Sequence, residues 1–273
     1  MDNGIDSQEF SLSLVMALHN GAKFIRRQAN SIVKSIPLEL PLQVVLVDDH
    51  SCDDSVDIAV SCFSCLNNCE ILVIRNLENI GPFLSFFEGI KHCKGSVIFL
   101  SDQDYEWYEE KTIKILDAFT ENKNVQLVCH SARVHRGDDK QLSLYPTVRY
   151  GEMFVLGCCL AFRSIYSADL TQRYEEVCSI LGYPLGHDRF ICFYFNSFGS
   201  TLLMEKKLIT YYIHGDNYSC RRKTKRPFLI SMVEKAIERS ALYRVFKFSE
   251  LEGFQLKFKK VVFSVTDRLL SRR

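Results

Sequence analysis

Acidic residues at three places in the sequence could take part in metal-assisted chemistry on a phosphate. They are the pair Asp48–Asp49, the aspartates of the triplet Asp102-Gln103-Asp104, and Asp188. Mg²⁺ and Mn²⁺ favour one or two carboxylates from the protein while phosphate oxygens fill other positions, and an Asp-x-Asp on a tight turn after a buried strand offers such ligands. Two aspartates one residue apart also arise by chance and then serve as turn or capping residues, so the motif alone is a weak signal.

The elements that must position these acids alternate between short apolar strands and amphipathic helices. We expect strands at residues 12–18, 43–47, 71–75, 97–101 and 126–130. Asn20 stands where the N-cap of the first helix belongs, and Pro37 ends that helix. The alternation predicts an α/β fold with a Rossmann-like, mostly parallel sheet that carries helices on both faces. Such a sheet binds ligands at the carboxyl ends of its strands, where the acids fall.

The pattern is less regular after residue 131. We expect a strand over residues 154–162, a helix from Ser164 onward and another helix over residues 187–198. Asp188 would then lie in the first turn of a helix, where a carboxylate can also serve as an ordinary cap.

Four blocks of sequence, taken in order, resemble the family 2 glycosyltransferases of the GT-A fold, in particular their rhamnosyltransferase-like subset. They are SLVMALHNGAKFIRRQANSI at 13–32, VVLVDDHSCDDS at 44–55, GSVIFLSDQDYEW at 95–107, and HD at 187–188 with YYIHGDN at 211–217. Together they span roughly residues 11–217, which leaves the C-terminal tail outside the resemblance.

The resemblance implies roles for residues that bind a nucleotide sugar and perform the transfer. Ala17 and Asp49 match positions that contact the nucleotide base, and the resemblance places Asp102 either toward the ribose or behind the direct ligands of the metal. Gly157 matches a position where the backbone approaches the sugar or acceptor. Asp188 matches the general base that deprotonates the acceptor hydroxyl in inverting members.

The resemblance also implies a divalent cation, Mg²⁺ or Mn²⁺, with Asp104 as the expected ligand and His214 near the diphosphate. The chain departs from the family pattern at Tyr105, where a further aspartate is usual, although Trp107 is retained. That change puts the geometry and affinity of the metal site in doubt.

Structural explanations compete with each of these roles. Asp49 could cap the following helix, and Asp188 could do the same for its own. His214 could be a polar residue ending a strand, and Gly157 could be a packing glycine. Cys62, Cys65 and Cys69 include a Cys-x-x-Cys spacing, but without a second pair they are better explained as half-buried thiols than as a zinc site.

Composition describes an ordinary globular chain of 273 residues, 47% hydrophobic and 25% charged. Its 11 cysteines are scattered and odd in number, which favours a reducing compartment. We see no signal peptide and no run of about 18 apolar residues, so we expect a cytoplasmic protein without a membrane-spanning helix.

Charge divides the chain into two predicted parts, a GT-A domain over residues 1–220 and a basic amphipathic helical tail over residues 221–273. The tail holds 15 Lys+Arg against 5 Asp+Glu. A basic amphipathic helix suits an anionic membrane surface, which predicts peripheral contact with the inner face of the plasma membrane. Packing of the helix on the domain is the alternative, and nucleic acid is not expected because no binding motif is present.

We therefore expect an inverting glycosyltransferase that uses a dTDP- or UDP-sugar and a glycan or lipid-linked acceptor, with a role in bacterial envelope polysaccharide synthesis. A nucleotidyltransferase would need a glycine-rich phosphate loop after the first strand, and the turn His19-Asn20-Gly21 has one glycine. A nucleotide-sugar-binding or scaffold protein that lost turnover is the other alternative, and Tyr105 is the residue that favours it.

Overall fold

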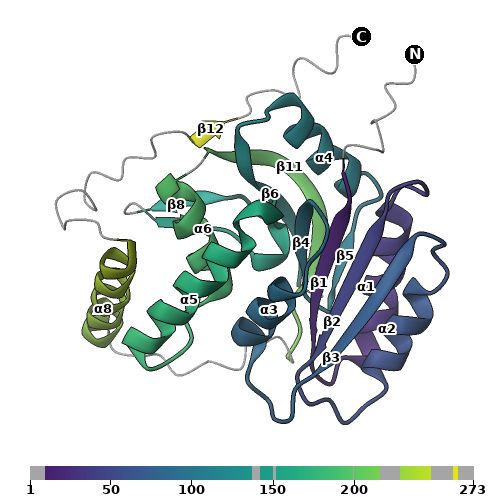
Figure 1. Ribbon diagram of the computed structural model, residues 1–273, viewed down its shortest axis with the longest axis horizontal. Helices are drawn as coiled ribbons and strands as arrows, with labels where there is room; N and C mark the ends of the chain where they lie inside the picture. Colours follow the sequence, from purple (N-terminus) through teal and green to yellow (C-terminus); the bar gives the residue numbers. More distant parts are fainter. Residues whose placement is uncertain are drawn as a thin grey trace.

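The computed structural model describes residues 10–136, 142–149, 152–198, 200–215, 228–246 and 261–263. A central sheet with helices on both faces dominates the described part of the chain (Figure 1). Its strand order is β12-β11-β6-β10-β4-β1-β2-β3, with β5 added beside β11 and β7 beside β6.

The first half of the chain is a regular alternation of strands and helices. Its elements are β1 (Leu12–Leu18), α1 (Ala22–Ser35), β2 (Leu42–Asp48), α2 (Ser55–Phe63), β3 (Cys69–Arg75), α3 (Pro82–Lys91) and β4 (Val97–Ser101). β1 pairs in parallel with β2 and β4, and β2 pairs in parallel with β3. The expected strands and helices of this half are confirmed.

One local expectation in this half is wrong. Asn20 is not the N-cap of α1, because Gly21 holds that position and Asn20 adopts a left-handed φ of 48°. The Asn20 side chain instead accepts a hydrogen bond from the Cys52 backbone N–H (2.8 Å), which ties the two loops after β1 and β2 together.

The second half is less regular. Its elements are β5 (Tyr105–Trp107), α4 (Lys111–Glu121), β6 (Val125–His135), β7 (Leu142–Leu144), β8 (Thr147–Arg149), β9 (Glu152–Phe154), the 3₁₀ turn Gly157–Cys159, β10 (Leu160–Arg163), the 3₁₀ turn Ser164–Tyr166, α5 (Ser167–Leu181), α6 (His187–Phe198), β11 (Ser200–Tyr212), α8 (Phe228–Phe246) and β12 (Val261–Phe263). β10 runs antiparallel to both β4 and β6. β11 pairs in parallel with β6 and with β12. The sheet is therefore mostly parallel, as expected, with β10, β5 and β7 as its antiparallel strands.

The strand expected over residues 154–162 is also wrong. The segment is β9, then the 3₁₀ turn Gly157–Cys159, then β10. Gly157, Cys158 and Cys159 are all buried, so the turn is as apolar as a strand. Apolar character alone does not distinguish a buried strand from a buried turn.

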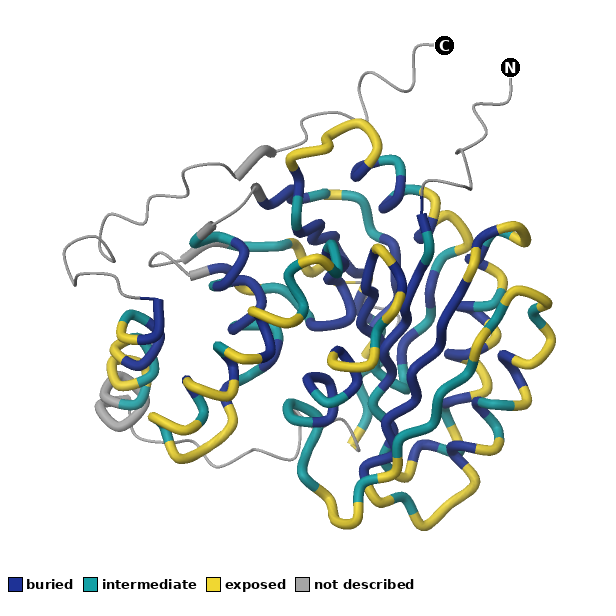
Figure 2. The backbone as a smooth tube through the Cα atoms, in the orientation of Figure 1, coloured by how far each residue is buried: buried dark blue, intermediate teal, exposed yellow. Residues whose placement is uncertain are grey.

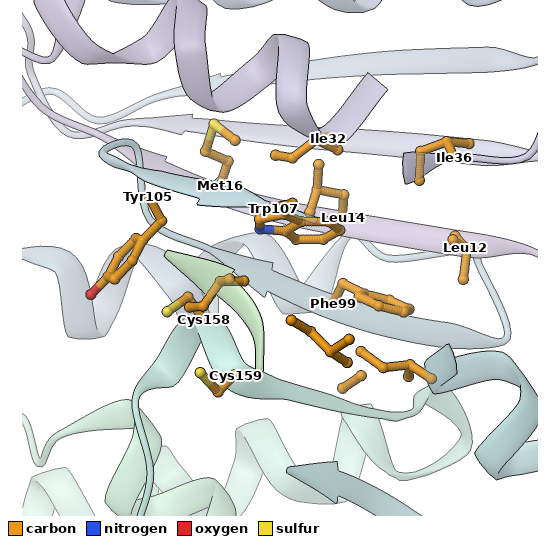
Figure 3. Packing of buried hydrophobic residues seen from close by; sticks show 14 of the residues in the cluster. Leu12, Leu14, Met16, Ile32, Ile36, Phe99, Tyr105, Trp107, Cys158 and Cys159 are labelled. Carbon is orange, nitrogen blue, oxygen red and sulfur yellow. The ribbon is translucent and has the colours of Figure 1, made fainter. Parts of the chain in front are cut away.

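Two layers of buried side chains, one on each face of the sheet, form the core. The layer under α1, α2 and α4 includes Trp107 and Phe99, whose ring centroids are 5.7 Å apart (Figure 3). The layer under α3, α5 and α6 is rich in aromatic rings, among them Phe87 stacked on Tyr174. Figure 2 shows that the central strands are buried while the outer sides of the helices are exposed. This double covering explains why β1, β2 and β4 are almost continuously apolar.

Within residues 221–273 the structure describes α8 and β12. α8 lies against α5 and buries Ala241, Leu242, Val245 and Phe246. This part of the helix packs on the rest of the protein, as the alternative explanation of the tail expected. The cluster Arg221–Arg226 lies outside the described residues. Among the helices that the structure describes, none combines the length and apolar content needed to cross a bilayer.

Candidate active site

A cavity of about 410 Å³ opens at the carboxyl ends of β1, β2 and β4. It is lined by all seven residues singled out from the sequence: Ala17, Asp49, Asp102, Asp104, Gly157, Asp188 and His214. These residues come from several strands, turns and a helix that span about 200 positions of the chain. The carboxyl edge of the sheet therefore brings them together, as expected for an open α/β sheet.

The Asp49 carboxylate organises the loop that leads into α3. It accepts hydrogen bonds from the backbone N–H groups of Ile80 and Gly81 (both 2.8 Å) and from the Asn76 side chain (2.9 Å). Gly81 has a φ of 86°, a conformation that favours glycine. Asp49 is 2% exposed and does not cap α2, so it holds one wall of the cavity in place.

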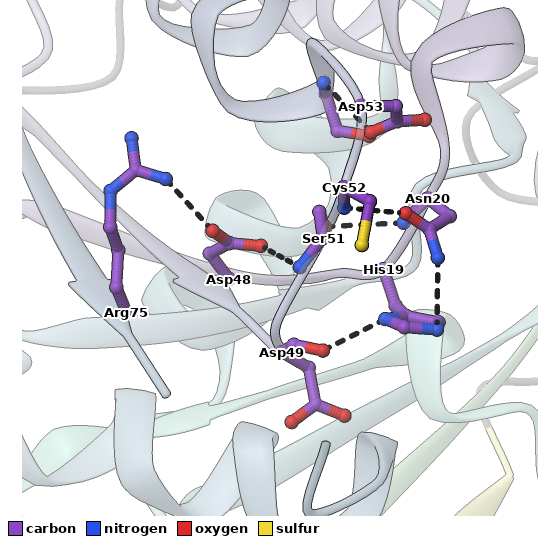
Figure 4. Close-up of polar contacts among 9 residues, drawn as sticks. His19, Asn20, Asp48, Asp49, Ser51, Cys52, Asp53 and Arg75 are labelled. Atoms are coloured by element: carbon purple, nitrogen blue, oxygen red, sulfur yellow. Dashed lines mark hydrogen bonds and ion pairs between the residues drawn. The ribbon is translucent and has the colours of Figure 1, made fainter. Parts of the chain in front are cut away.

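The neighbouring Asp48 has a different partner set (Figure 4). Its carboxylate accepts hydrogen bonds from Arg75 (2.9 Å) and from the Ser51 backbone N–H (3.0 Å). Asp48 therefore closes the turn after β2 and links it to β3. The two adjacent acids have different roles, since Asp48 faces the turn and Asp49 lies at the cavity.

His19, Asn79 and Gln103 also line the cavity, although the sequence analysis gave them no role. His19 lies 2.8 Å from the Asp49 carbonyl oxygen through Nδ1, and Asn79 lies within 3.2 Å of the His19 ring. The Gln103 amide accepts from the His19 N–H and donates to the His19 carbonyl, each at 3.0 Å. The middle residue of the Asp-x-Asp triplet thus fastens its turn to the end of β1.

Asp104 and His214 meet because β5 pairs with β11. Tyr105 lies opposite Tyr211 in this antiparallel pair, and the residues just beyond the strands are thereby adjacent. His214 Nε2 is 3.0 Å from Asp104 Oδ2, and the His214 ring stacks on Phe24 at 4.2 Å. Tyr105 itself is buried beside Tyr211, with ring centroids 4.9 Å apart.

Asp102 lies in an environment that disfavours its negative charge. Withdrawal from water raises the pKa of Asp102 to about 8, and repulsion from Asp104 and Asp188 adds to the effect. A hydrogen bond with Tyr105 acts in the opposite direction. A cation among these acids would relieve the repulsion between them and would favour the charged form of Asp102.

The donor set fits a divalent cation that is shared with a ligand. Asp104 and His214 offer one carboxylate and one imidazole at the same point of the cavity. Among the described residues there is no group of three or more His, Cys, Asp or Glu that could enclose a metal. A cation held here would therefore take most of its ligands from a diphosphate and water, as Mg²⁺ and Mn²⁺ commonly do.

Asp188 lies in the first turn of α6, and its half-buried side chain lines the cavity. Its Oδ1 accepts a hydrogen bond from the backbone N–H of Arg189 (2.7 Å). Both the capping explanation and the functional one are thus compatible with its position.

A buried lysine supports the turn that carries Gly157. The Lys111 ammonium donates to the Cys158 carbonyl (2.8 Å) and lies 3.6 Å from the centroid of the Trp107 ring. Burial lowers the pKa of Lys111 to about 8, while the nearby thiols and Asp102 oppose that shift. Lys111 therefore holds the buried turn whose residue Gly157 lines the cavity. The sequence pattern did not reveal this role.

The ten cysteines in the described ranges form no disulfide. Cys62 lies on α2, Cys65 follows that helix and Cys69 begins β3, so the prediction that one helix carries all three is wrong. Burial raises the pKa of Cys69 to about 11, which keeps this thiol protonated.

Comparison with known proteins adds a family to this geometry. The model of glycosyl transferase family 2 matches residues 13–174. An uncharacterized glycosyltransferase of Mycoplasma genitalium is 26% identical over 118 residues, which is 43% of this chain and 39% of that protein. The match therefore covers about two-fifths of that relative's length.

Solved structures with a similar fold include residues 1–349 of S. aureus TarS. Its complex with UDP has a TM-score of 0.58 at 21% identity, covering 90% of this chain and 75% of that chain. The complex of the same TarS residues with UDP-GlcNAc has a TM-score of 0.57 at 20% identity, covering 91% and 76%. At this level of identity the likeness concerns the fold.

Proposed function

Because the chain belongs to glycosyl transferase family 2, we propose that it moves one sugar from a nucleotide-diphosphate sugar to an acceptor hydroxyl with inversion at the anomeric carbon. The observation that carries this proposal is the meeting of Asp104, Asp188 and His214 at one cavity. The transfer requires a site for the diphosphate and a base near the acceptor. These residues supply candidates for both.

Asp188 is the proposed general base. Its carboxylate takes the proton of the acceptor hydroxyl while that oxygen forms a bond to the anomeric carbon. The bond from the anomeric carbon to the diphosphate oxygen breaks in the same displacement, and the electron pair leaves with the nucleotide. A single displacement of this kind inverts the anomeric configuration.

Asp104 and His214 are the proposed ligands of Mg²⁺ or Mn²⁺. When bound, the cation neutralises the charge that develops on the departing diphosphate. The chain's own contribution is to hold the carboxylate and the imidazole side by side, through β5–β11 pairing and the stacking of His214 on Phe24.

A UDP-sugar is the proposed donor, with a dTDP-sugar as the alternative. The similar fold of TarS, which has been solved with UDP and with UDP-GlcNAc, supports the first choice. Ala17 and the Asp49 loop would face the base, and Asp102 the ribose. Transfer of rhamnose, and a glycan or lipid-linked acceptor in bacterial envelope synthesis, rest on the sequence resemblance alone.

The tail is proposed to bring the enzyme to an anionic membrane. Its excess of Lys and Arg supports this, while the residues that α8 buries against α5 are already occupied in packing. Flotation of the full chain on phosphatidylserine vesicles tests it, and equal flotation on neutral phosphatidylcholine vesicles would contradict it.

The decisive experiment combines ligand binding with turnover. A thermal-shift panel of UDP-GlcNAc, UDP-glucose, UDP-galactose and dTDP-rhamnose, each with and without Mn²⁺, identifies the donor by the melting temperature it raises. Hydrolysis or transfer of that donor is then measured for the wild type and for Asp104→Asn. We expect the Mn²⁺-dependent turnover to disappear in the variant while the fold is kept. Undiminished turnover contradicts the metal role.

Tyr105 favours a second candidate, a nucleotide-sugar-binding protein without turnover. An aromatic ring occupies this buried position in place of a third carboxylate. Calorimetric binding of a UDP-sugar without any hydrolysis or transfer, in the presence of Mn²⁺, would support this candidate over the enzyme.

A further inference from the structure

We infer that the side chain of His187 binds a hydroxyl group of the donor sugar and thereby helps to select which sugar the protein accepts. This inference rests on the proposed function, because it presumes that the cavity holds a nucleotide sugar. His187 immediately precedes Asp188 and lines the same cavity.

The first observation is that His187 is buried without a polar partner. Its exposed fraction is 6%, and neither ring nitrogen has a hydrogen-bond partner among the residues that the structure describes. A buried polar group without a partner carries a desolvation penalty, so it needs an explanation. A ligand in the adjoining cavity supplies one.

The second observation is that the surroundings hold the imidazole at the cavity wall. The ring lies against Phe86 and Phe83, with centroid distances of 4.3 and 5.7 Å. The Nε2 end of the ring faces Gly157, where an added Cβ atom would overlap it. The absence of a side chain at Gly157 is therefore what leaves room for His187 beside the ligand space.

The chemistry of the ring favours a hydroxyl over a phosphate. Burial lowers the pKa of His187, and the smaller influence of Asp188 acts in the opposite direction. A neutral imidazole has one N–H donor and one acceptor nitrogen, whereas an anionic phosphate is best bound by a cation. A sugar hydroxyl can pair with either nitrogen, because it both donates and accepts.

Depth in the cavity favours the donor over the acceptor. His187 is 6% exposed and lies against Phe86 and Gly157, while the neighbouring Asp188 is half-buried and therefore more accessible. The acceptor must reach Asp188 from the open side in order to lose its proton there. The sugar that lies beneath it is the group within reach of His187.

The test uses two variants at this position and one matched control. His187→Leu removes both nitrogens, and His187→Gln restores a polar end on a flexible chain. His130→Leu is the control, since His130 is also a buried histidine and is not among the residues that line the cavity. Calorimetry with Mn²⁺ measures the Kd of UDP-GlcNAc and of UDP for each protein, and unfolding is monitored in parallel.

We expect His187→Leu to weaken UDP-GlcNAc by about tenfold, the loss of one well-placed hydrogen bond, while UDP stays within about twofold. His187→Gln should recover part of the lost affinity, and His130→Leu should match the wild type for both ligands. The ratio of affinities for UDP-glucose and UDP-galactose, which differ in the configuration of one hydroxyl, should also change in His187→Leu.

Equal weakening of UDP and UDP-GlcNAc would show that His187 only supports the fold of the cavity, and unchanged binding of both would show no role in binding. Either result overturns the inference while leaving the proposed function intact. A wild-type protein that binds none of the nucleotide sugars in the panel would instead remove the proposed function, and the inference with it.

Discussion

The polar side chains on the two sides of the cavity differ in how far the protein itself satisfies their hydrogen bonds. On the side built by β1, β2 and the loop before α3, Asp48, Asp49 and Asn20 are all engaged with other parts of the protein. On the side built by α6, the buried His187 ring has no hydrogen-bond partner in the described chain, and Asp188 accepts only a local bond from Arg189 among the contacts described. Groups satisfied within the protein hold its shape, whereas groups left unsatisfied at a cavity are available to a ligand.

This comparison predicts different costs on the two sides. Substitutions on the β1–β2 side should lower the stability of the fold, and their effect on turnover should follow from that. Substitutions on the α6 side should lower turnover or donor selection with little effect on stability. A substitution on the β1–β2 side that lowers turnover without lowering stability would contradict the comparison. A substitution on the α6 side that mainly lowers stability would contradict it too.

The largest effect is expected from Asp188→Asn. Removing a general base slows a reaction by roughly 10²–10⁴-fold, so we expect about a 10³-fold loss of kcat for sugar transfer. The amide keeps an oxygen that can accept from the Arg189 N–H, and the melting temperature should therefore stay close to that of the wild type. Steady-state transfer with the donor found in the thermal-shift panel, together with thermal unfolding, measures both quantities.

Asp169→Asn is the matched control for that variant. Asp169 is an aspartate of α5 that bonds Arg173 and Tyr194 and does not line the cavity. It should keep transfer within about twofold of the wild type, since a surface substitution away from the site rarely disturbs chemistry. If Asp188→Asn unfolds so readily that its loss of stability accounts for its loss of activity, Asp188 is a helix cap and not a base.

Asp49→Ala is expected to have the next largest effect, and on stability. The change leaves the backbone N–H groups of Ile80 and Gly81 and the Asn76 amide without their carboxylate partner. An unpaired buried donor of this kind costs about 1–3 kcal/mol when water cannot replace the partner. Because water from the cavity can reach some of these three donors, we expect a total loss of about 2–4 kcal/mol. Urea unfolding followed by circular dichroism measures the change.

Arg75→Ala provides the comparison on the same side of the cavity. Arg75 pairs with Asp48 but is 61% exposed, so solvent screens the interaction and its loss should cost less than about 1 kcal/mol. If Asp49→Ala costs no more than Arg75→Ala, the Asp49 carboxylate does not hold the loop, and the contrast between the two sides fails.

The first and second halves of the chain differ in how much of their structure could be predicted from the sequence. In the first half β1, β2 and β4 are buried on both faces and the helices have one apolar side, so local pattern and parallel topology agree. Parallel strands must end at one edge, which is why the amino-acid pattern alone was enough to place Asp49 and Asp104 together. The turn of Asn20 was missed because its bond to Cys52 links residues that are 32 positions apart.

The other half depends on contacts that local pattern does not contain. β5 has three residues, and its pairing with β11 joins segments about 100 positions apart in the chain. That pairing places His214 at Asp104, and only the family resemblance had suggested that His214 mattered. The isolation of His187 depends on Phe86, Gly157 and α6 coming together, so no motif in the sequence could have shown it.

The smallest expected effect concerns the pH dependence of stability, and it sharpens the assignment of His187 to the ligand side. Burial lowers the pKa of His187 in the folded protein below the ordinary value of about 6.5. Between these two values the unfolded chain takes up a proton that the folded chain does not, so the fold loses stability as pH falls through that window.

His187→Gln has no such group. Its melting temperature should therefore gain on that of the wild type as the pH is lowered from 7 to 5. A constant difference between the two proteins over this range would mean that His187 accepts its proton as readily in the fold as outside it, and the ring would then be suited to an anion instead of a hydroxyl.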